Sequence, residues 1–522
     1  DLTLTGVAAG AQVGSGGVVI VGTSHYVVSS PLWDNGGAAK AGAATWANGT
    51  TGLTGLVSAA NSLVGSNAND NVGLVTALAN GNYVVATTRW DSPANADVGA
   101  VTWANGSSGR AGVVAGGRPL VGSTQGDHIG AFVTALVNGH YVAGSPDWEN
   151  SASATARVGA ATWCSGTAAT SAVVSAANSL IGISQDDRVA SAGARALSNG
   201  NYVVQSPDGR NGGNAAGAAT WRNGAASSPG VVAGTNSQVG TSSADAVGAG
   251  VLALANGNFV LASPAWDNGA IANAGAVTWG NGTGGNAGPL SAVNSLVGSQ
   301  LGDAIGTRVI ALAGGHYVSA SATWDLGAVA DVGAASFGNG NGGTVGVVNA
   351  ANALVGSTAL DGVGQALLAL SNGNYLVASP GWSDGALAAV GAITWATGSG
   401  GINGAVAAGN SMRGSSSNDR IGQPGLISLP DGKALLLSSL YDNGAVADAG
   451  AVSLLDGASA LPATLDPALS VLGTVAAGGA GMASAQSVAY DPPRGQVVVG
   501  RPASNRVTLL RVVDPVFADG FE

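Results

Sequence analysis

The stretch GNFVLASPAWDNGAIANAGAVTWGNG, from Gly257 to Gly282, decides the fold because most of the chain repeats it. It opens on an Asn-Gly type turn and contains a short apolar strand, a loop around Trp266 and a second strand that ends at Trp279. Internal repeats are therefore the first property to establish, since a missed repeat misassigns the whole fold.

The glycine of the motif Leu-Val-Gly-Ser marks the repeat. Successive marks are 57 to 60 residues apart, which leaves no room for a linker or a second domain. We therefore expect one domain over residues 1–522, built from nine repeats of about 58 residues, with residues 514–522 as a tail. The marking glycines are Gly6, Gly65, Gly122, Gly182, Gly240, Gly298, Gly356, Gly414 and Gly473.

One period, from Gly298 to Gly356, separates into four short strands joined by turns and Gly/Asn-rich loops. The turn between the first two strands is Gly-Gly-His here and Asn-Gly-Asn in four other repeats, at 80–82, 199–201, 256–258 and 372–374, which is favoured hairpin chemistry. No segment shows the 3.6-residue apolar period of a helix. The predicted strands of this period are 309–312, 317–321, 333–337 and 353–357.

Four short antiparallel strands per unit are typical of a β-propeller blade. The last unit stops after its third strand, whereas residues 2–6 read as a fourth strand without its first three. We therefore predict an all-β, nine-bladed β-propeller of four-stranded antiparallel blades. Residues 1–6 would pair with the C-terminal blade and close the ring without an open edge. The alternative is eight blades with a detached final unit.

Composition excludes several classes of function. The net charge is −11, with 17 Lys and Arg against 28 Asp and Glu, so no basic patch is available for nucleic acid or an anionic membrane. A single cysteine, Cys164, cannot form an internal disulfide or a cysteine-based metal site. No run of 18 apolar residues predicts a transmembrane segment, and the start at Asp1 shows no signal peptide, as in a processed form. We expect a monomer.

The segment GAVTWGNGTGGNAGPLSAVNSLVGSQLGDAIG, residues 275–306, resembles the FG-GAP repeat of integrin-alpha-type β-propellers. Ile305-Gly306 stands where that family has Phe-Gly, and Ser263-Pro264 stands for its Ala-Pro. The repeat sequence also resembles that of an uncharacterised bacterial secreted repeat family. The ending VFADGFE at 516–522 resembles the tails of proteins exported by some Gram-negative bacteria. These resemblances imply an extracellular or cell-surface location.

The FG-GAP resemblance also implies a place to look for calcium. Blades of that family that bind calcium carry an Asp-rich loop between the first two strands, which supplies several oxygen ligands. This chain has Asn-Gly-Asn there and no Asp-x-Asp-x-Asp run. We therefore expect neither calcium nor another metal or cofactor.

All twelve tryptophans fall in two columns of the repeat. The second column, which ends the third strand, predicts packing between blades. The first column follows the second strand beside Asp and Asn, and such loops either bind sugars, through ring stacking and hydroxyl hydrogen bonds, or pack as pinned turns. The second column is Trp46, Trp103, Trp163, Trp221, Trp279 and Trp395. The candidate ligand-binding residues are Trp33, Asp34, Asn35, Trp90, Asp91, Trp148, Trp266, Asp267, Asn268, Trp324, Asp325 and Trp382.

A column of aspartates precedes the first strands, and it predicts either an acidic ring that collects cations or a set of turns capped by carboxylates. Its members are Asp70, Asp127, Asp187, Asp245, Asp303, Asp361 and Asp419.

The sequence contains few patterns that are typical of a catalytic site. His25, His140 and His316 occupy the turn position of Asn and read as turn substitutes, and His128 lies beside Asp127 without a nucleophile. We therefore assign no catalytic residue and expect an extracellular adhesin- or lectin-like binding module that holds a glycan or protein at its loops. The alternatives are a secreted hydrolase or lyase acting on polysaccharide through carboxylates near the channel, and a purely structural scaffold.

Overall fold

The structure is a computed structural model that describes residues 3–6, 11–117, 119–153 and 155–511. The chain forms two compact units. The N-terminal unit contains the chain up to Ala253 together with Gly257–Leu261 and Gly280–Leu290, and the C-terminal unit contains the rest. The predicted tail at 514–522 lies outside the described residues.

The first two strands of each repeat form a hairpin, because both are rich in β-branched and aromatic residues and a glycine with positive φ lies in most of the turns between them. The first strands are β2 (Gly17–Val21), β7 (Leu74–Ala77), β12 (Phe132–Ala135), β17 (Ala194–Ala196), β24 (Gly250–Ala253), β29 (Arg308–Ala311), β34 (Ala366–Ala369), β39 (Pro424–Ser428) and β43 (Val488–Asp491). The second strands are β3 (His25–Ser30), β8 (Tyr83–Thr87), β13 (Tyr141–Ser145), β18 (Tyr202–Ser206), β25 (Phe259–Ser263), β30 (Tyr317–Ser321), β35 (Tyr375–Ser379), β40 (Lys433–Ser438) and β44 (Gln496–Arg501).

The third strand carries an Ala-rich, buried start, and the fourth strand is the Leu-Val segment before the marking glycine. The third strands are β4 (Ala43–Asn48), β9 (Ala100–Ala104), β14 (Ala160–Cys164), β21 (Ala218–Arg222), β26 (Ala276–Gly280), β31 (Ala334–Gly338), β36 (Ala392–Ala396), β41 (Ala451–Asp456) and β45 (Arg506–Arg511). The fourth strands are β1 (Leu4–Thr5), β6 (Leu63–Val64), β11 (Leu120–Val121), β16 (Ser179–Ile181), β23 (Gln238–Val239), β28 (Ser295–Val297), β33 (Leu354–Val355), β38 (Ser411–Arg413) and β42 (Ser470–Leu472).

A fifth kind of strand links neighbouring repeats. It is two residues long, lies in the Gly-rich loop after the third strand and pairs in parallel with the fourth strand of the preceding repeat. The linking strands are β5 (Gly55–Leu56), β10 (Gly112–Val113), β15 (Ala172–Val173), β22 (Gly230–Val231), β27 (Gly288–Pro289), β32 (Gly346–Val347) and β37 (Gly404–Ala405). A minor hairpin joins β19 (Arg210–Asn211) to β20 (Asn214–Ala215).

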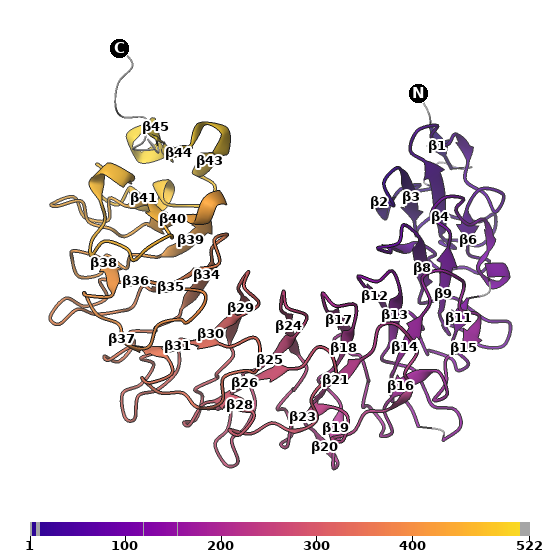
Figure 1. Cartoon of the computed structure of the whole chain (residues 1–522). Coiled ribbons are helices and arrows are strands. Elements are labelled where there is room, and N and C mark those ends of the chain that lie inside the picture. Colours follow the sequence, from indigo (N-terminus) through magenta and orange to yellow (C-terminus); the bar gives the residue numbers. More distant parts are fainter. Residues whose placement is uncertain (1–2, 7–10, 118, 154, 512–522) are drawn as a thin grey trace. The chain divides into compact units, whose positions relative to one another are not determined.

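A complete sheet therefore has five strands. In the N-terminal unit the order β2-β3-β4-β6-β10 starts the series, with antiparallel pairing up to β6 and parallel pairing between β6 and β10. Figure 1 shows β2, β3 and β4 side by side near the N-terminus. The C-terminal unit contains the same arrangement in β29-β30-β31-β33-β37. Parallel pairing thus joins each complete sheet to the next repeat by backbone hydrogen bonds.

The sequence predicted the antiparallel strands closely. In the period chosen above, β30 coincides with the predicted strand, β29 and β31 are displaced by one residue, and β33 lies within the predicted fourth strand. The four-stranded antiparallel core is confirmed, but the parallel linking strand was missed. Its two residues lie within a Gly-rich loop, where no alternation of apolar and polar residues can develop.

The predicted pairing of residues 1–6 with the C-terminal blade stays a prediction. β1 pairs in parallel with β5, with Leu4 opposite Gly55 and Thr5 opposite Leu56. β5 is the linking strand of the first repeat, and β1 pairs with it as the fourth strand β6 pairs with the linking strand β10. The last unit, β43-β44-β45, forms a three-stranded sheet among the described residues. The structure is thus all-β with sheets of mostly four or five strands, and the nine-bladed propeller stays a prediction.

Each repeat contributes its second and third strands to the core. Tyr83, Tyr141, Tyr317 and Tyr375 are among the largest fully buried side chains. Helical segments are short: α1 (Gly479–Met482) and the 3₁₀ turns η1 (Val114–Gly117), η2 (Pro430–Gly432), η3 (Pro467–Leu469), η4 (Pro492–Arg494) and η5 (Pro502–Ser504). Within the described ranges, no helix has the length and apolar character needed to cross a membrane.

Candidate functional site

The second tryptophan column binds each repeat to the next. The indole Nε1 of Trp221 donates a hydrogen bond to the carbonyl of Gly282, 2.9 Å away and 61 residues later. The same bond recurs at 2.8–2.9 Å in the other five members of the column, Trp46, Trp103, Trp163, Trp279 and Trp395. The predicted packing of this column between repeats is confirmed.

Turn asparagines converge on the same glycine carbonyl. Gly282 also accepts hydrogen bonds from the Nδ2 atoms of Asn199 at 2.7 Å and Asn201 at 2.8 Å, while its own N–H donates to Asn258 Oδ1 at 3.0 Å. A Cβ at Gly282 would lie far inside 3.0 Å of the Gly257 carbonyl oxygen. Glycine is therefore required where the chain passes this close to the preceding turn.

Two of the turn histidines replace the accepting asparagine in these turns. His140 Nδ1 accepts from the N–H of Gly166 at 3.2 Å, and His316 Nδ1 accepts from the N–H of Gly340 at 3.1 Å. The His140 ring lies 4.8 Å from the Trp163 ring. His25 lies 5.1 Å from Trp46 in the same arrangement. The interpretation of the turn histidines as substitutes for Asn is confirmed for His140 and His316 by these hydrogen bonds, and they are part of the scaffold.

The aspartate column closes loops. Asp303 Oδ2 accepts from the N–H groups of Ser299 at 2.7 Å and Gln300 at 2.8 Å, and its Oδ1 accepts from the N–H of Asp325 at 3.0 Å. All seven carboxylates are buried, and Oδ2 makes the same two backbone contacts in Asp70, Asp127, Asp187, Asp245, Asp361 and Asp419. Capping is therefore confirmed, and an acidic ring open to cations is not formed.

Burial also affects the protonation of this column. It raises the pKa of Asp70, Asp127 and Asp303 above the ordinary value of 3.8, against the opposing effect of the backbone hydrogen bonds.

The first tryptophan column is buried, and its predicted ligand-binding role stays a prediction. Trp33, Trp148, Trp266, Trp324, Trp382 and Trp90 expose between 2% and 6% of their surface. The cause lies in the aspartate column, which holds the residue after the tryptophan: Asp127 Oδ1 accepts from the N–H of Glu149 at 2.9 Å. Trp148 packs into a core that its repeat shares with the preceding repeat.

The polar residues predicted beside these tryptophans also close the loop. Asp34 Oδ1 accepts from the N–H of Lys40 at 2.7 Å, and Asn35 Nδ2 donates to the carbonyl of Gly65 at 2.8 Å. Asp91, Asp267, Asp325 and Asn268 make the corresponding contacts in their own repeats. Their predicted ligand-binding role stays a prediction, and Asp91 is the member that also lines a cavity.

That cavity is open, has a volume of about 530 Å³ and lies in the N-terminal unit. Arg89, Asp91, Asp97 and His128 line it together with Asn69. Ion pairs continue the charged surface beside it. His128 Nδ1 lies 3.4 Å from Asp147 Oδ2, Arg188 Nη2 lies 3.1 Å from Asp147 Oδ1, and Arg157 Nη2 lies 2.6 Å from Asp186 Oδ1. We call Arg89, Asp91, Asp97, His128, Asp147, Arg157, Asp186 and Arg188 the charged loop cluster.

The charged loop cluster breaks the repeat. His128 and Arg188 directly follow the column aspartate, where three later repeats have Ala246, Ala304 and Gly362 and another has Arg420. Asp186 precedes that aspartate, where later repeats have Ala244, Gly302 and Leu360. The scaffold therefore does not need these charges. Comparison of the repeats position by position could have identified them in a chain with only 9% charged residues, but the sequence reasoning above followed residues that recur.

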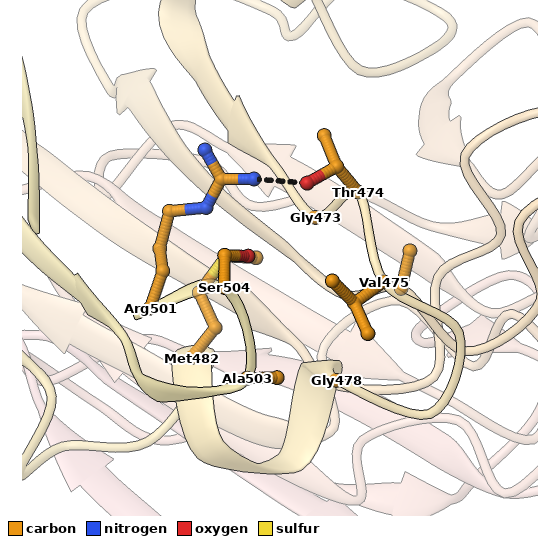
Figure 2. Close-up of a pocket in the computed structure, with 9 residues that line it drawn as sticks. Gly473, Thr474, Val475, Gly478, Met482, Arg501, Ala503 and Ser504 are labelled. Atoms are coloured by element: carbon orange, nitrogen blue, oxygen red, sulfur yellow. Dashed lines mark hydrogen bonds between the residues drawn. The ribbon is translucent and has the colours of Figure 1, made fainter. Parts of the chain in front are cut away.

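Another pocket lies in the C-terminal unit, where Arg501 Nη2 donates to Thr474 Oγ1 at 3.0 Å (Figure 2). Its volume is about 10 Å³, which is room for about one water molecule. Arg501 is 9% exposed and joins β44 to the loop after β42. The hydrogen bond from Arg501 to Thr474 therefore stabilises the last sheet, and the pocket is too small for a ligand. Across the residues that the structure describes, no group of three or more His, Cys, Asp or Glu is placed to hold a metal ion.

Comparison with known proteins concerns the repeat itself. The solved structures include the extracellular domain of the putative one component system BT4673 from B. thetaiotaomicron, which is 10% identical with a TM-score of 0.19. The match covers 94% of this chain and 54%, about half, of that chain. A TM-score this low is no evidence of a shared fold. No curated protein is significantly similar.

A family described as a repeat of unknown function, DUF5650, matches eight consecutive segments. They are residues 20–74, 77–131, 135–191, 196–249, 253–307, 311–365, 369–423 and 428–482. The matched segments run from the first hairpin through β42, so the three-stranded unit β43-β44-β45 lies beyond them. Because these segments make up most of its length, the chain belongs to the DUF5650 repeat family.

Proposed function

We propose that this chain is a binding module in which the repeats form a rigid scaffold and the charged loop cluster recognises a polar ligand. The observation that carries the proposal is the break in the repeat. Recurring Trp, Asp and Asn side chains make hydrogen bonds and packing contacts within the scaffold, whereas Arg89 and His128, which line the 530 Å³ cavity, have no charged counterpart in most later repeats. Charged side chains that the scaffold does not need favour a role in ligand recognition.

The chemistry of the cavity favours a hydroxyl-rich ligand such as a glycan. Its volume lies within the roughly 300–1,000 Å³ of small-molecule sites. Arg89 offers guanidinium donors, which suit a carboxylate or a hydroxyl oxygen, and Asp91 and Asp97 offer acceptors for hydroxyl donors. His128 adds an imidazole, held by Asp147. Mixed donors and acceptors of this kind match a sugar better than an apolar ligand.

An extracellular or cell-surface location belongs to the same proposal. It is supported by the resemblance of the repeat to FG-GAP sequences and by the likeness of the ending to exported tails. Kinship with FG-GAP repeats is likewise a proposal, supported by the Asp-x-x-Gly segments that recur along the chain, as from Asp303 to Gly306.

A glycan array tests the binding proposal with three proteins: the unchanged chain, His128→Ala and Arg420→Ala. Arg420 is the matched control because it also follows a column aspartate, Asp419, but lies outside the charged loop cluster. Ala304 has φ 48° at the position equivalent to His128, so alanine fits the backbone there. We expect a glycan signal that His128→Ala weakens by about tenfold or more, as for a lost charged hydrogen bond.

Arg420→Ala should leave that signal unchanged. No signal on any glycan, or an equal loss in both variants, would contradict the proposal. Reducing-sugar release from the bound glycan would instead favour the polysaccharide-acting enzyme.

A further inference from the structure

A pocket lies at the junction of the first and second repeats, within the N-terminal unit. Its volume is about 280 Å³, just below the roughly 300–1,000 Å³ of small-molecule sites, so a small ligand fits it. The end of β4, the loop after β4 and the loop after β9 line it. β4 ends where β3 begins, with Asn48 opposite His25, whereas the loops of the charged loop cluster follow the ends of second strands. The pocket is therefore at the opposite end of the sheets from that cluster.

Trp46 gives the pocket an aromatic surface that is already fixed in place. Unlike the tryptophans of the first column, Trp46 is only partly buried. Its Nε1 donates to the carbonyl of Gly106 at 2.8 Å. Its side chain lies against Gly109, where an added Cβ would be 2.6 Å from the Trp46 Cβ. An indole held in this way loses little rotamer freedom when the apolar face of a sugar ring stacks on it.

Arg110 is the one charged residue among those that line the pocket. Its Nη2 donates to the carbonyl of Gly116 at 2.8 Å, and no ion pair within the described ranges includes it. A guanidinium group can bind a carboxylate or a similar anion through two parallel hydrogen bonds. In a chain with a net charge of −11, this cation beside an aromatic ring therefore favours an anionic ligand.

The scaffold does not require an arginine at this position, two residues before the linking strand β10. The corresponding residues of the other repeats are uncharged: Leu53, Thr170, Ser228, Asn286, Thr344 and Ile402. A partly buried indole followed by an arginine in the next loop thus distinguishes the first junction from those formed by Trp103, Trp163, Trp221 and Trp279. Like the charged loop cluster, the pocket is marked by a residue that breaks the repeat.

We propose that this pocket binds an anionic sugar, with the sugar ring on Trp46 and its carboxylate or sulfate on Arg110. Asn48, Thr51 and Ser108 also line the pocket and supply neutral groups for the sugar hydroxyls. Among the described residues, no hydrogen bond uses the Nδ2 of Asn48 or the hydroxyls of Thr51 and Ser108. A sugar suits this mixture better than an acidic peptide, because one ring covers the indole while its hydroxyls reach both loops. The site goes beyond the proposed function, since it shares no residue with the charged loop cluster.

Isothermal titration calorimetry with matched sugars tests the need for a negative charge. Oligogalacturonate is compared with its methyl ester, which keeps the sugar and removes the charge of the carboxylates. A carrageenan oligosaccharide, which carries sulfate esters, is compared with a neutral agarose oligosaccharide. We expect at least one anionic sugar to bind, and its neutral counterpart to bind about tenfold or more weakly, as for lost charge-assisted hydrogen bonds.

The pair that shows this difference identifies the anion as a carboxylate or a sulfate. No binding of either anionic sugar, or equal affinities within both pairs, would overturn the proposal. So would tighter binding of a glutamate-rich peptide than of either sugar.

Two variants test the residue. Arg110→Gln should weaken binding of the anionic sugar by about tenfold or more and leave that of its neutral counterpart unchanged. Arg308→Gln is the matched control, because it removes the same charge from an exposed residue outside the pocket, and it should bind as the unchanged chain does. Thermal melting should show both variants folded, since uncharged side chains occupy the position of Arg110 in other repeats.

An unchanged affinity in Arg110→Gln would contradict the proposal. An equal loss in His128→Ala would also contradict it, because the sugar would then be bound at the charged loop cluster. The two ligand sites can therefore fail independently of each other.

Discussion

Replacement of Gly282 by alanine tests the contact that joins one repeat to the next. The carbonyl of Gly282 accepts three hydrogen bonds from the preceding repeat, at 2.7 Å from Asn199, 2.8 Å from Asn201 and 2.9 Å from Trp221. The added Cβ would lie well inside 3.0 Å of a backbone oxygen, that of Gly257. A backbone oxygen cannot rotate away, so one of the two chain segments has to move.

The size of the effect follows from these contacts. Overpacking at a tight site costs about 1–3 kcal/mol. Movement of Gly282 lengthens the three hydrogen bonds, and each contributes about 1 kcal/mol net to stability. A gain of about 0.4–1 kcal/mol from the stiffer unfolded chain opposes these losses. We therefore expect Gly282→Ala to lower the free energy of unfolding by about 3–5 kcal/mol.

Urea unfolding followed by tryptophan fluorescence measures this change, because Trp221 lies at the perturbed contact. Gly284→Ala is the matched control: it lies two residues away in the same loop, and nothing is within 4 Å of its Cβ position. The control should unfold within about 0.5 kcal/mol of the unchanged chain, as surface substitutions usually do. If Gly282→Ala unfolds at the same urea concentration as Gly284→Ala, the convergent carbonyl does not hold the repeats together.

Two further predictions follow from buried ionisable groups. Burial raises the pKa of the Cys164 thiol to about 12, so iodoacetamide should leave this thiol unmodified in the folded chain at mildly alkaline pH. Mass spectrometry should show modification of Cys164 only when the chain is unfolded in urea. Modification of Cys164 in the folded chain would contradict its burial. Burial, with the nearby charge of Asp325, raises the pKa of Asp303 above 3.8, so the folded state holds this proton more tightly than the unfolded state does. The stability of the unchanged chain relative to Asp303→Asn should therefore be greatest below pH 3.8 and fall as the pH rises through the raised pKa. A thermal melting series in which that difference grows with pH would show that the backbone hydrogen bonds outweigh burial.

Much of the local fold could be predicted from the sequence, because each strand lies between turn residues with clear chemistry. The hairpin before Tyr317 follows from a turn of Gly and His, and the strand at 317–321 was predicted to the residue. The roles of the turn histidines and of the second tryptophan column were predicted as well, since recurrence at fixed positions indicates a scaffold role.

The candidate site was predicted less well, because exposure cannot be read from residue type. Trp266 beside Asp267 has the composition of a sugar-binding loop, yet the indole is 3% exposed. Hydrogen bonds from distant loops to the aspartate column decide this burial, and no local pattern encodes them. The charged loop cluster was missed for the opposite reason, since it consists of residues that do not recur.

The sequence by itself determined the repeat, its period, the four antiparallel strands and the turns that connect them, because these depend on chemistry within a few residues. The tertiary structure decided which edges meet. It paired β1 with β5 and joined the repeats through two-residue parallel strands, because backbone hydrogen bonds there are made regardless of side-chain pattern. It also decided that the tryptophans beside Asp and Asn are core and that charged side chains surround the open cavity, because burial depends on segments that are distant in the chain.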